Sequence, residues 1–429
     1  MADKKQTAKY GRTDDGKRAS GRREPSLRDN DKIRVDGEIK RRQNKYYSKL
    51  AERFRIAGFA FFLMFVLFCG VMMVSYSEYI TYDNFVYLIR DFDSMDRTGT
   101  DLVSEITFEM DPSAATCSFR GGFVVAKRDS VTVYDSTGVV LLSEKESYSY
   151  PALAVSEKYI IAYDIGGTGY SVYNAVTRIA SRKTEFPIVS ASVCDSGAFA
   201  LTTESDEAKY VTEVYNSALL NTMSIFKDKY VVSSAISADG EWICIASLAE
   251  SGADFACETS FYKVGDSEAS ATYLYSMAMP LKCTGLDNGC FVVVCDDSVR
   301  FYNNSGELIK ENQITGNGIS SFDAEPWGVV LACREGSLGT KNRVYACDAK
   351  GNIIYDMILE DRVNSVVLAS ADDTATAYLV SGDEVLTLFG QKTVRENFGA
   401  DVDRLLLTDS GVFAYVSEKA LLVGKNNDE

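Results

Sequence analysis

The 429-residue sequence predicts an all-β protein: a β-propeller of eight four-stranded antiparallel blades, preceded by one transmembrane helix and a disordered basic tail. Three observations predict this architecture. After residue 103, short runs rich in Val, Ile, Tyr and Phe alternate with Gly, Asp and Asn turns. A turn motif recurs about every 40 residues, which is the repeat length of propeller blades. Near the N-terminus, 22 consecutive residues carry no charge.

Residues 1–55 differ in charge from the rest of the chain. They hold 18 Lys and Arg against 9 Asp and Glu, a net of +9, whereas the remaining residues hold 27 against 52, a net of −25. The tail has little apolar periodicity, so it cannot bury enough surface to offset the entropy of ordering, and we expect it to be disordered. Its acidic residues interleave with the basic ones, and we do not expect it to bind nucleic acid.

Residues 56–77 form the uncharged run, IAGFAFFLMFVLFCGVMMVSYS. As a helix they are long enough to cross a hydrocarbon core about 30 Å thick. A buried helix of a soluble domain is the first alternative, but this segment is apolar on all sides. A cleaved signal peptide is the second, but the polar leader is too long and no small-residue cleavage site follows.

The flanking charges predict the orientation of this helix. Basic residues precede it and a net acidic segment follows it, so the positive-inside rule keeps the N-terminus in the cytoplasm and exports the C-terminal domain. The sequence therefore predicts a single-pass signal-anchor protein of the cell membrane. We expect the basic side chains before the bilayer-spanning segment to contact anionic lipid headgroups, namely Lys40, Arg41, Arg42, Lys45, Lys49, Arg53 and Arg55.

Residues 78–102 lie between the membrane segment and the propeller. Apolar side chains recur there at the spacing of one helical face, at Phe85, Leu88, Ile89 and Phe92. With several aromatic residues nearby, this pattern predicts a short amphipathic stalk helix followed by a hinge. A plain linker is the alternative.

The turn motif appears most clearly in three segments: RFYNNSGELIK (300–310), TVYDSTGVVLL (132–142) and YACDAKGNIIY (345–355). Each has an apolar run, then Asp or Asn, two small or polar residues, Gly, and a second apolar run. Asx residues and glycine at these positions are typical of tight turns between antiparallel strands. We interpret the motif as the turn that joins the third and fourth strands of a blade.

An earlier turn in each unit joins its first two strands. The spacing between successive tips varies from 36 to 49 residues, and eight tips predict eight blades, at Gly122, Lys158, Gly197, Gly240, Gly289, Gly328, Asp373 and Gly411. Seven blades is the alternative, because the Asp373 tip lacks glycine and residues 250–272 are irregular.

The last unit has too few strands to form a complete blade. After residue 402 the sequence contains three short strands, DRLLLTDS, GVFAYVSE and KALLVGK, whereas residues 103–109 form a lone strand before the first unit. We therefore expect the strand 103–109 to join the last blade and close a propeller that spans residues 103–425. Closure removes exposed sheet edges.

These features resemble the superfamily of WD-repeat-like and quinoprotein-like propellers. More narrowly, the order of basic tail, anchor, aromatic stalk and Y-[DN]-x-x-G turns resembles uncharacterised single-pass, propeller-bearing membrane proteins of clostridial-type bacteria. The sequence lacks the Gly-His and Trp-Asp pairs of true WD repeats, and its only tryptophans are Trp242 and Trp327. The resemblance therefore implies the architecture, and neither a quinone cofactor nor a WD-type partner follows from it.

The composition argues against several kinds of active site. The chain has no histidine, which removes His-based acid–base catalysis and His-ligated metals. No C-x-x-C motif occurs among the ten cysteines. The pairs 296–297 and 372–373 are Asp-Asp, but neither stands in a spaced calcium loop. We expect no catalytic, cofactor-binding or metal site, and we interpret these acids as turn formers.

Most cysteines stand in apolar strands and are expected to be small core side chains. Cys244 and Cys257 flank a predicted hairpin almost symmetrically, which makes them the best candidate disulfide. The nine cysteines after the membrane segment are an odd number, so at least one thiol stays free.

We therefore predict a binding scaffold, with no catalysis: a propeller outside the membrane that presents loops to a protein or an envelope polymer. A carboxylate-based glycan-active enzyme is the first alternative, because such enzymes need only paired acids. A sensor of an extracellular ligand is the second.

Overall fold

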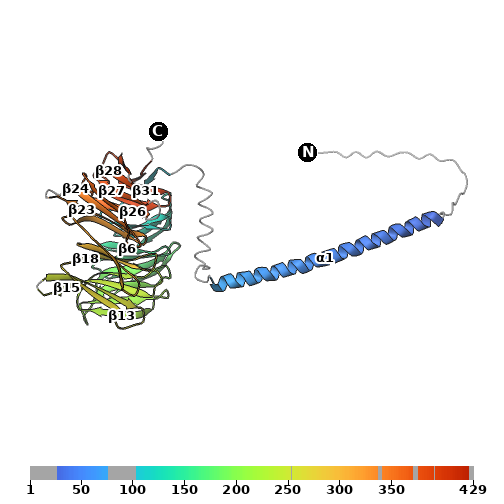
Figure 1. Ribbon diagram of the computed structural model, residues 1–429, viewed down its shortest axis with the longest axis horizontal. Coiled ribbons are helices and arrows are strands. Elements are labelled where there is room, and N and C mark those ends of the chain that lie inside the picture. The colour runs from blue at the N-terminus through green and yellow to red at the C-terminus, as the bar shows by residue number, and fades with distance from the viewer. Residues whose placement is uncertain are drawn as a thin grey trace, which may run out of the picture. The chain divides into compact units, whose positions relative to one another are not determined.

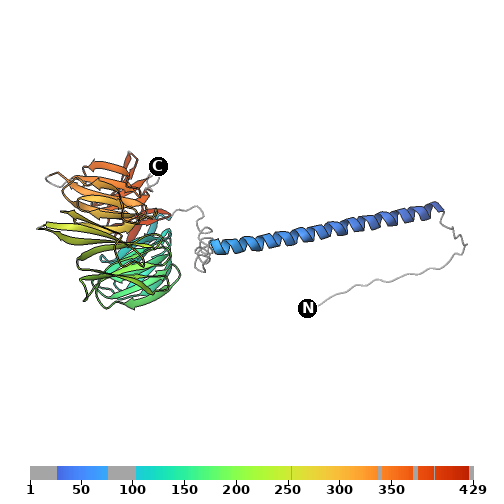
Figure 2. The same ribbon diagram turned by 60° about the horizontal axis from the view of Figure 1, so that its bottom comes forward.

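The computed structural model describes residues 27–75, 103–252, 254–336, 341–370, 375–390 and 392–424 (Figures 1 and 2). The chain divides into two compact units, residues 1–86 and 87–429, which we describe separately. The first contains one described helix, and the second contains all the described strands. The predicted stalk, residues 78–102, lies outside the described residues.

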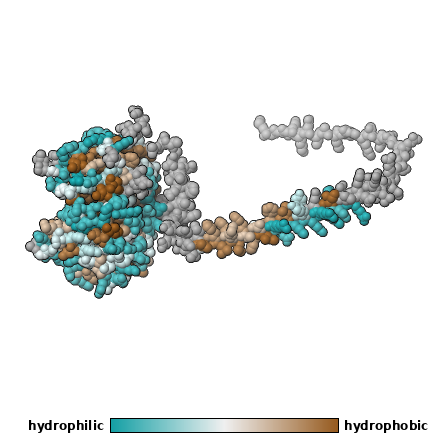
Figure 3. All heavy atoms as spheres, in the orientation of Figure 1, coloured by the Kyte–Doolittle hydropathy of each residue, from teal (hydrophilic) through white to brown (hydrophobic). Residues whose placement is uncertain are grey.

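The helix of the first unit, α1 (Leu27–Ser75), is 49 residues long. Its stretch Glu38–Val71 includes an 18-residue window with a mean hydropathy of 2.2, and this window is fully exposed. In Figure 3 the C-terminal part of the helix is brown with apolar side chains and the N-terminal part is mainly teal. By length and composition, α1 can span a membrane.

The prediction that residues 1–55 are disordered is wrong for residues 27–55. Residues 27–55 are helical and continuous with the apolar run. Two physical effects favour this. Lys, Arg, Glu, Gln and Leu are good helix formers, and extending an existing helix needs no new nucleus. Residues 1–26 lie outside the described residues.

Each of the first four blades is a meander of four strands. Blade 1 consists of β2 (Ala115–Phe119), β3 (Gly122–Ala126), β4 (Ser130–Tyr134) and β5 (Val140–Lys145). Blade 2 consists of β6 (Pro151–Val155), β7 (Tyr159–Asp164), β8 (Gly169–Asn174) and β9 (Arg178–Lys183). Blade 3 consists of β10 (Ile188–Val193), β11 (Phe199–Glu204), β12 (Tyr210–Tyr215) and β13 (Asn221–Lys227). Blade 4 consists of β14 (Tyr230–Ile236), β15 (Trp242–Ser251), β16 (Asp254–Lys263) and β17 (Ala271–Ser276).

The next three blades repeat the meander. Blade 5 consists of β18 (Pro280–Gly285), β19 (Phe291–Cys295), β20 (Ser298–Tyr302) and β21 (Leu308–Gln313). Blade 6 consists of β22 (Ile319–Glu325), β23 (Gly328–Glu335), β24 (Lys341–Asp348) and β25 (Ile353–Leu359). Blade 7 consists of β26 (Ser365–Ser370), β27 (Thr376–Ser381), β28 (Glu384–Phe389) and β29 (Lys392–Asn397).

Blade 8 joins the two ends of the propeller. Its sheet order is β1-β32-β31-β30, formed by β1 (Glu105–Thr107), β30 (Arg404–Thr408), β31 (Gly411–Val416) and β32 (Lys419–Leu422). Strand β1 pairs antiparallel with β32, with Ile106 opposite Ala420. The prediction of eight four-stranded blades is confirmed and the seven-blade alternative is wrong. The Asp373 tip lies outside the described residues.

The core lies between neighbouring sheets. First strands of adjacent blades contact one another, as β14 does β18, which places first strands around the centre of the ring. The second strands are sandwiched between blades, so all five residues of β3 and of β19 are buried. Phe108, just after β1, packs on Phe123 and Tyr134 of blade 1 and on Tyr415 of blade 8. This aromatic contact closes the ring.

The meander gives the propeller two distinct faces. On the turn face lie the turns between first and second strands and between third and fourth strands. On the link face lie the turns between second and third strands and the links between blades. Neighbouring blades hydrogen-bond on the turn face, as when Asp409 N donates to Gly121 O over 2.7 Å.

The recurrent motif of the sequence forms these third-to-fourth-strand turns on the turn face. In RFYNNSGELIK, Asn303 Oδ1 accepts from Glu307 N at 2.8 Å, and Gly306 N donates to Asn303 O at 3.0 Å. Asp135 and Asp348 make the same side-chain contact with the residue four positions later. The Asx side chain thus replaces a strand partner for an otherwise unpaired backbone N–H.

Candidate functional site

Blade 4 extends beyond the other blades on the link face. Strands β15 and β16 have ten residues each and pair along their whole length, from Trp242 opposite Lys263 to Ser251 opposite Asp254. Both ribbon views show this hairpin, labelled β15 in Figure 1, reaching past its neighbours. The irregular segment of the sequence, residues 250–272, falls in this blade.

Exposed apolar side chains lie on this part of the link face. Phe255 is 43% exposed, Met277 67% and Met279 42%. We call these three residues the blade-4 apolar cluster. Met277 N donates to Phe255 O at 2.8 Å, so the first two are cross-strand neighbours. Met277 also has a φ of 61°, a conformation that costs a residue with a side chain about 1 kcal/mol or more.

Acidic side chains gather near the centre of the ring at the end of β22. Asp323 and Glu325 stand two residues apart on this first strand of blade 6, and Asp323 Oδ2 accepts a hydrogen bond from Leu368 N of blade 7 at 3.4 Å. Lys282 of β18 reaches across from blade 5, and its Nζ donates to Ala324 O at 3.1 Å. The cluster therefore connects two inner strands with a cation between blades.

The surroundings of these acids favour their protonated forms. Burial, and next the neighbouring charge of Asp323, raise the pKa of Glu325 to about 8, while Lys282 acts in the opposite direction. Burial also raises the pKa of Asp323. From across the ring, the charge of Glu325 adds to burial in raising the pKa of Cys117, on blade 1, to about 12. Both shifts favour the uncharged carboxyl over the carboxylate.

The sequence did not single out Asp323, Glu325 or Lys282. The segment FDAE, before the tip at Gly328, alternates polar and apolar residues as any half-buried strand does. A signal was present in the placement of two acids on a first strand, which faces the centre of a propeller. To use that signal, one must know the register of the blade, that is, which residues of the strand face the centre. The turn spacing alone does not determine this register.

The geometry of the acids does not form a metal site. Among the residues that the structure describes, no group of three or more Cys, Asp or Glu is placed to hold a metal ion. Asp296 accepts a hydrogen bond from Met279 N at 2.6 Å, and Asp297 pairs with Arg300 at 2.8 Å. These two acids thus serve a turn and an ion pair. Residues 372–373 lie outside the described ranges.

The candidate disulfide between Cys244 and Cys257 is wrong. In the β15–β16 register, Cys244 lies opposite Phe261 and Cys257 opposite Leu248. The two cysteines are thus four pairs apart along the hairpin, roughly 13 Å at strand spacing, whereas bridged Cα atoms lie within about 7 Å. Both thiols are free. Each contacts a different cysteine of blade 5.

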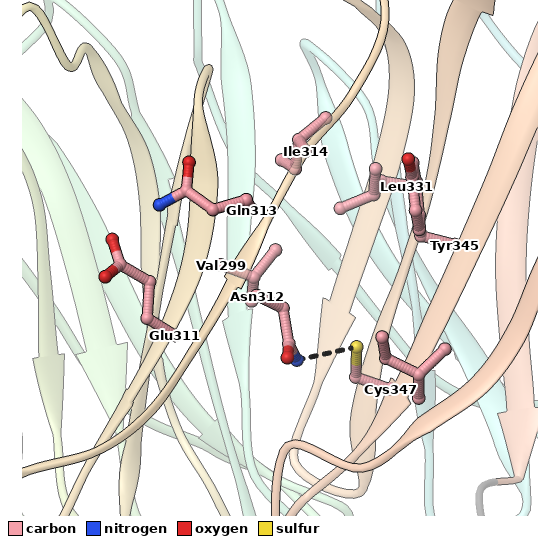
Figure 4. A pocket seen from close by; sticks show the side chains of 9 residues that line it. Val299, Glu311, Asn312, Gln313, Ile314, Leu331, Tyr345 and Cys347 are labelled. Carbon is pink, nitrogen blue, oxygen red and sulfur yellow. Dashed lines mark hydrogen bonds between the residues drawn. The ribbon is translucent and has the colours of Figure 1, made fainter.

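Two small pockets lie on the propeller. The first, with a volume of about 160 Å³, lies between blades 5 and 6, where Asn312 Nδ2 donates to Cys347 Sγ at 3.3 Å (Figure 4). The second, about 200 Å³, is polar and is lined by Arg334, Arg362 and the buried Asn342. Both are smaller than the roughly 300–1,000 Å³ typical of small-molecule sites.

The closed ring of eight four-stranded sheets is a β-propeller, and solved WD40 propellers share this fold. The chain belongs to the Family of unknown function (DUF5711), whose model matches residues 95–425. No curated protein matches it in sequence.

Solved structures share the fold at low sequence identity. The C-terminal WD40 domain of Sif2 aligns with a TM-score of 0.50 and 10% identity, covering 75% of this chain and 97% of that chain. Chaetomium thermophilum Sqt1 bound to the N-terminus of the ribosomal protein L10 aligns at 0.51 and 12%, covering 75% and 99%. Sqt1 from the same organism also aligns at 0.51 and 12%, covering 75% and 98%.

Proposed function

We propose that this chain is a single-pass, membrane-anchored scaffold whose propeller lies outside the cytoplasm and binds a protein through its link face. Helix α1 supplies a segment long and apolar enough to span the bilayer. The positive tail supports an N-terminus in the cytoplasm, where anionic headgroups attract residues 40–55. The net negative charge of the remaining chain favours solubility in an aqueous compartment.

The blade-4 apolar cluster is the observation that carries this proposal. Exposed Phe and Met side chains on one surface are typical of protein-binding sites, because they bury apolar area and adapt in shape. Among the structural neighbours, Sqt1 was solved bound to the N-terminus of the ribosomal protein L10, which supports protein binding by a propeller of this fold.

Carboxylate-based glycan hydrolysis is disfavoured by the contacts of the acids at the ring centre. A glycosidase needs two carboxyl groups that are free to face the sugar. Asp323 accepts a hydrogen bond from Leu368 N of blade 7 at 3.4 Å, and Lys282 of blade 5 binds the backbone oxygen of Ala324 at 3.1 Å. We therefore interpret these residues as a polar connection between neighbouring blades.

Crosslinking followed by co-purification of the full-length protein from its own membranes tests the proposal. A double variant, Phe255→Ser with Met277→Ser, removes the apolar cluster, and we expect it to lose a partner that the wild-type protein captures. Leu220→Ser is the matched control, because Leu220 is 62% exposed but lies on the turn side of blade 3. Equal capture by all three proteins would contradict the proposed surface.

The orientation is tested separately with intact cells whose outer barrier has been removed. We expect protease added from outside to cut exposed loops of the propeller while a tag at residue 1 stays protected. Protection of the propeller and loss of the tag would place the domain in the cytoplasm and overturn that part of the proposal.

A further inference from the structure

Four of the ten cysteines meet in one apolar core between blades 4 and 5. Cys244 and Cys257 come from blade 4, and Cys283 and Cys295 from blade 5; all four are buried. The Sγ atoms of Cys257 and Cys295 lie 3.7 Å apart. Cys283 instead places its Sγ 3.6 Å from the backbone oxygen of Cys244. The first pair therefore has sulfur facing sulfur across the boundary between blades.

The Cys257–Cys295 contact lies at a mechanically important position. Cys257 pairs with Leu248, three pairs from the end of the projecting hairpin at Ser251 and Asp254. Cys295 is the last residue of β19. Contact between the two sulfur atoms therefore joins the outer half of the hairpin to the neighbouring blade.

A buried cation lies beside this sulfur pair. Arg300 is 2% exposed, donates to Asp297 at 2.8 Å and to Glu311 at 2.9 Å, and stacks on Tyr275 at 3.9 Å. Its Nη1 is buried without a hydrogen-bond acceptor among the described residues. Its positive charge acts on both sulfur atoms. A cation at this place favours a thiolate.

Hydrogen bonds favour Cys257 as the ionised member. The hydrogen bond from the Cys295 thiol lowers the pKa of Cys257. Arg300 and the Thr259 hydroxyl, which lies 3.6 Å from the sulfur, also lower this pKa, whereas burial raises it. The same contact and burial raise the pKa of Cys295. In the packed protein the two thiols therefore differ: Cys257 ionises more readily than Cys295.

We propose that Cys257 and Cys295 form a disulfide that fastens the projecting hairpin of blade 4 to blade 5. The sulfur atoms are already in van der Waals contact and must approach by less than 2 Å to reach a bond length of about 2.05 Å. The two thiols lose two electrons and two protons. The oxidant is the disulfide of a thiol–disulfide oxidoreductase or a low-molecular-weight disulfide.

The exchange proceeds in two balanced steps. The thiolate of one cysteine attacks one sulfur of the oxidant, which forms a mixed disulfide and releases the other sulfur as a thiolate. The thiolate of the other cysteine then attacks the sulfur of the first cysteine and expels the second sulfur of the oxidant. The oxidant leaves as a dithiol or two thiols that hold both protons. Because both cysteines are buried in the folded protein, we place this exchange before blade 4 packs on blade 5.

This inference depends on one part of the proposed function, the location of the propeller outside the cytoplasm. A disulfide persists in an oxidising compartment outside the cytoplasm. There it would hold the hairpin, and with it the blade-4 apolar cluster, in one orientation, which lowers the entropy lost on binding a partner.

Refolding of the purified full-length protein in mixtures of oxidised and reduced glutathione tests the pair itself. After acid quenching, alkylation and digestion, we expect one linked pair of peptides, containing Cys257 and Cys295, and a mass lower by two hydrogen atoms. Amide exchange at Leu248 and Ala249 should then be at least about tenfold slower than in the reduced protein. If all ten cysteines are alkylated, or if Cys244 is linked to Cys283 instead, the proposal is overturned.

Two variants sharpen this test. Cys295→Ser should abolish the linked peptides, whereas Cys290→Ser, a partly buried cysteine of the same blade, should leave them unchanged. Loss of the linkage in both variants would show that the pairing is not specific to Cys295, and the proposal would fail.

Protein alkylated directly in its own membranes distinguishes this inference from the proposed function. The linkage in both the membrane sample and the refolded sample supports the pair and its oxidising setting. The linkage in the refolded sample alone supports the pair and contradicts the proposed location. Absence from the refolded sample overturns the pair, wherever the propeller lies.

Discussion

Asn303 illustrates how single side chains shape the propeller. Its amide oxygen holds the backbone N–H of Glu307, and the turn between them needs a residue with positive φ, which Gly306 supplies at 91°. Leu219 occupies the corresponding position in blade 3 with a φ of 59°. Blade 3 thus builds this turn with Leu219, for which a positive φ is unfavourable, whereas blade 5 builds it with Gly306, for which it is not.

We predict effects of different size when these two residues are substituted. Gly306→Ala should destabilise the protein by about 1–3 kcal/mol, because its Cβ would lie 2.5 Å from a ring carbon of Phe261 and its φ would be strained. Leu219→Gly relieves strain but removes apolar contacts, so its effect should be smaller than about 1 kcal/mol. Urea unfolding of the three proteins measures the difference; equal midpoints for Gly306→Ala and wild type would contradict it.

The second residue-scale prediction concerns pH and Glu325. Its pKa is raised to about 8 in the folded protein, so between pH 4.5 and 8 the folded state binds more protons than the unfolded state. Stability from this group is therefore lost as pH rises through that window. Glu325→Gln has no carboxyl to ionise, so it does not lose this stability. The free energy of unfolding of the variant minus that of the wild type should therefore be about 1–3 kcal/mol larger at pH 9 than at pH 4.5.

Unfolding midpoints measured from pH 4.5 to 9 provide the check. Glu360→Gln is the control for the loss of one carboxylate, because the Glu360 side chain is 75% exposed. The same pH dependence for Glu325→Gln as for this control would show that the Glu325 carboxyl is ionised without cost at the ring centre.

At the scale of elements, the three-residue strand β1 completes blade 8 and thereby closes the propeller. It is the outer strand of blade 8, and its central residue, Ile106, is 4% exposed between blades 8 and 1. The flanking residues Glu105 and Thr107 are exposed. Without β1, strand β32 would present an unpaired edge to solvent.

We predict that Ile106→Asp opens this closure, because it buries an unpaired charge in the apolar contact between the ends of the propeller. The loss should exceed about 3 kcal/mol, and the variant should associate through the freed edge of β32. Thr107→Asp, one residue away and exposed, should cost less than about 1 kcal/mol. Thermal unfolding and sedimentation report both effects; a monomeric Ile106→Asp protein of wild-type stability would contradict the prediction.

The hairpin β15–β16 shows a limit of reading elements from sequence. The turn tip at Gly240 placed the start of β15, and the pattern of four strands per unit was sufficient to predict blade 4. Its register was not predictable, because the segment from Glu250 to Thr272 alternates poorly and several slips would bury the same apolar residues. That uncertainty led to the wrong pairing of Cys244 with Cys257.

At the scale of the whole molecule, the features that depend on repetition were predictable. Eight turn tips at similar spacing predicted eight blades, and a uniformly apolar run predicted the helix that can span a membrane. The sites where blades meet were not predictable, since they depend on side chains more than 30 residues apart, such as Cys257 with Cys295 and Lys282 with Ala324. The recurring turns define the blades, but contacts between blades follow from packing in three dimensions.

The helix α1 decides whether the whole molecule is anchored, and two substitutions test it. Phe65→Arg with Leu67→Arg places two charges within the apolar run, and each costs about 2.5–3.5 kcal/mol at the centre of a bilayer-spanning helix. We expect wild-type protein to stay in the membrane pellet after alkaline extraction and the variant to be released. Phe65→Leu with Leu67→Phe keeps the composition and should behave as wild type. Since the propeller forms a separate compact unit, released variant should keep the unfolding midpoint of the propeller. Retention of the double-Arg variant in the pellet would mean that something other than α1 holds the protein to the membrane.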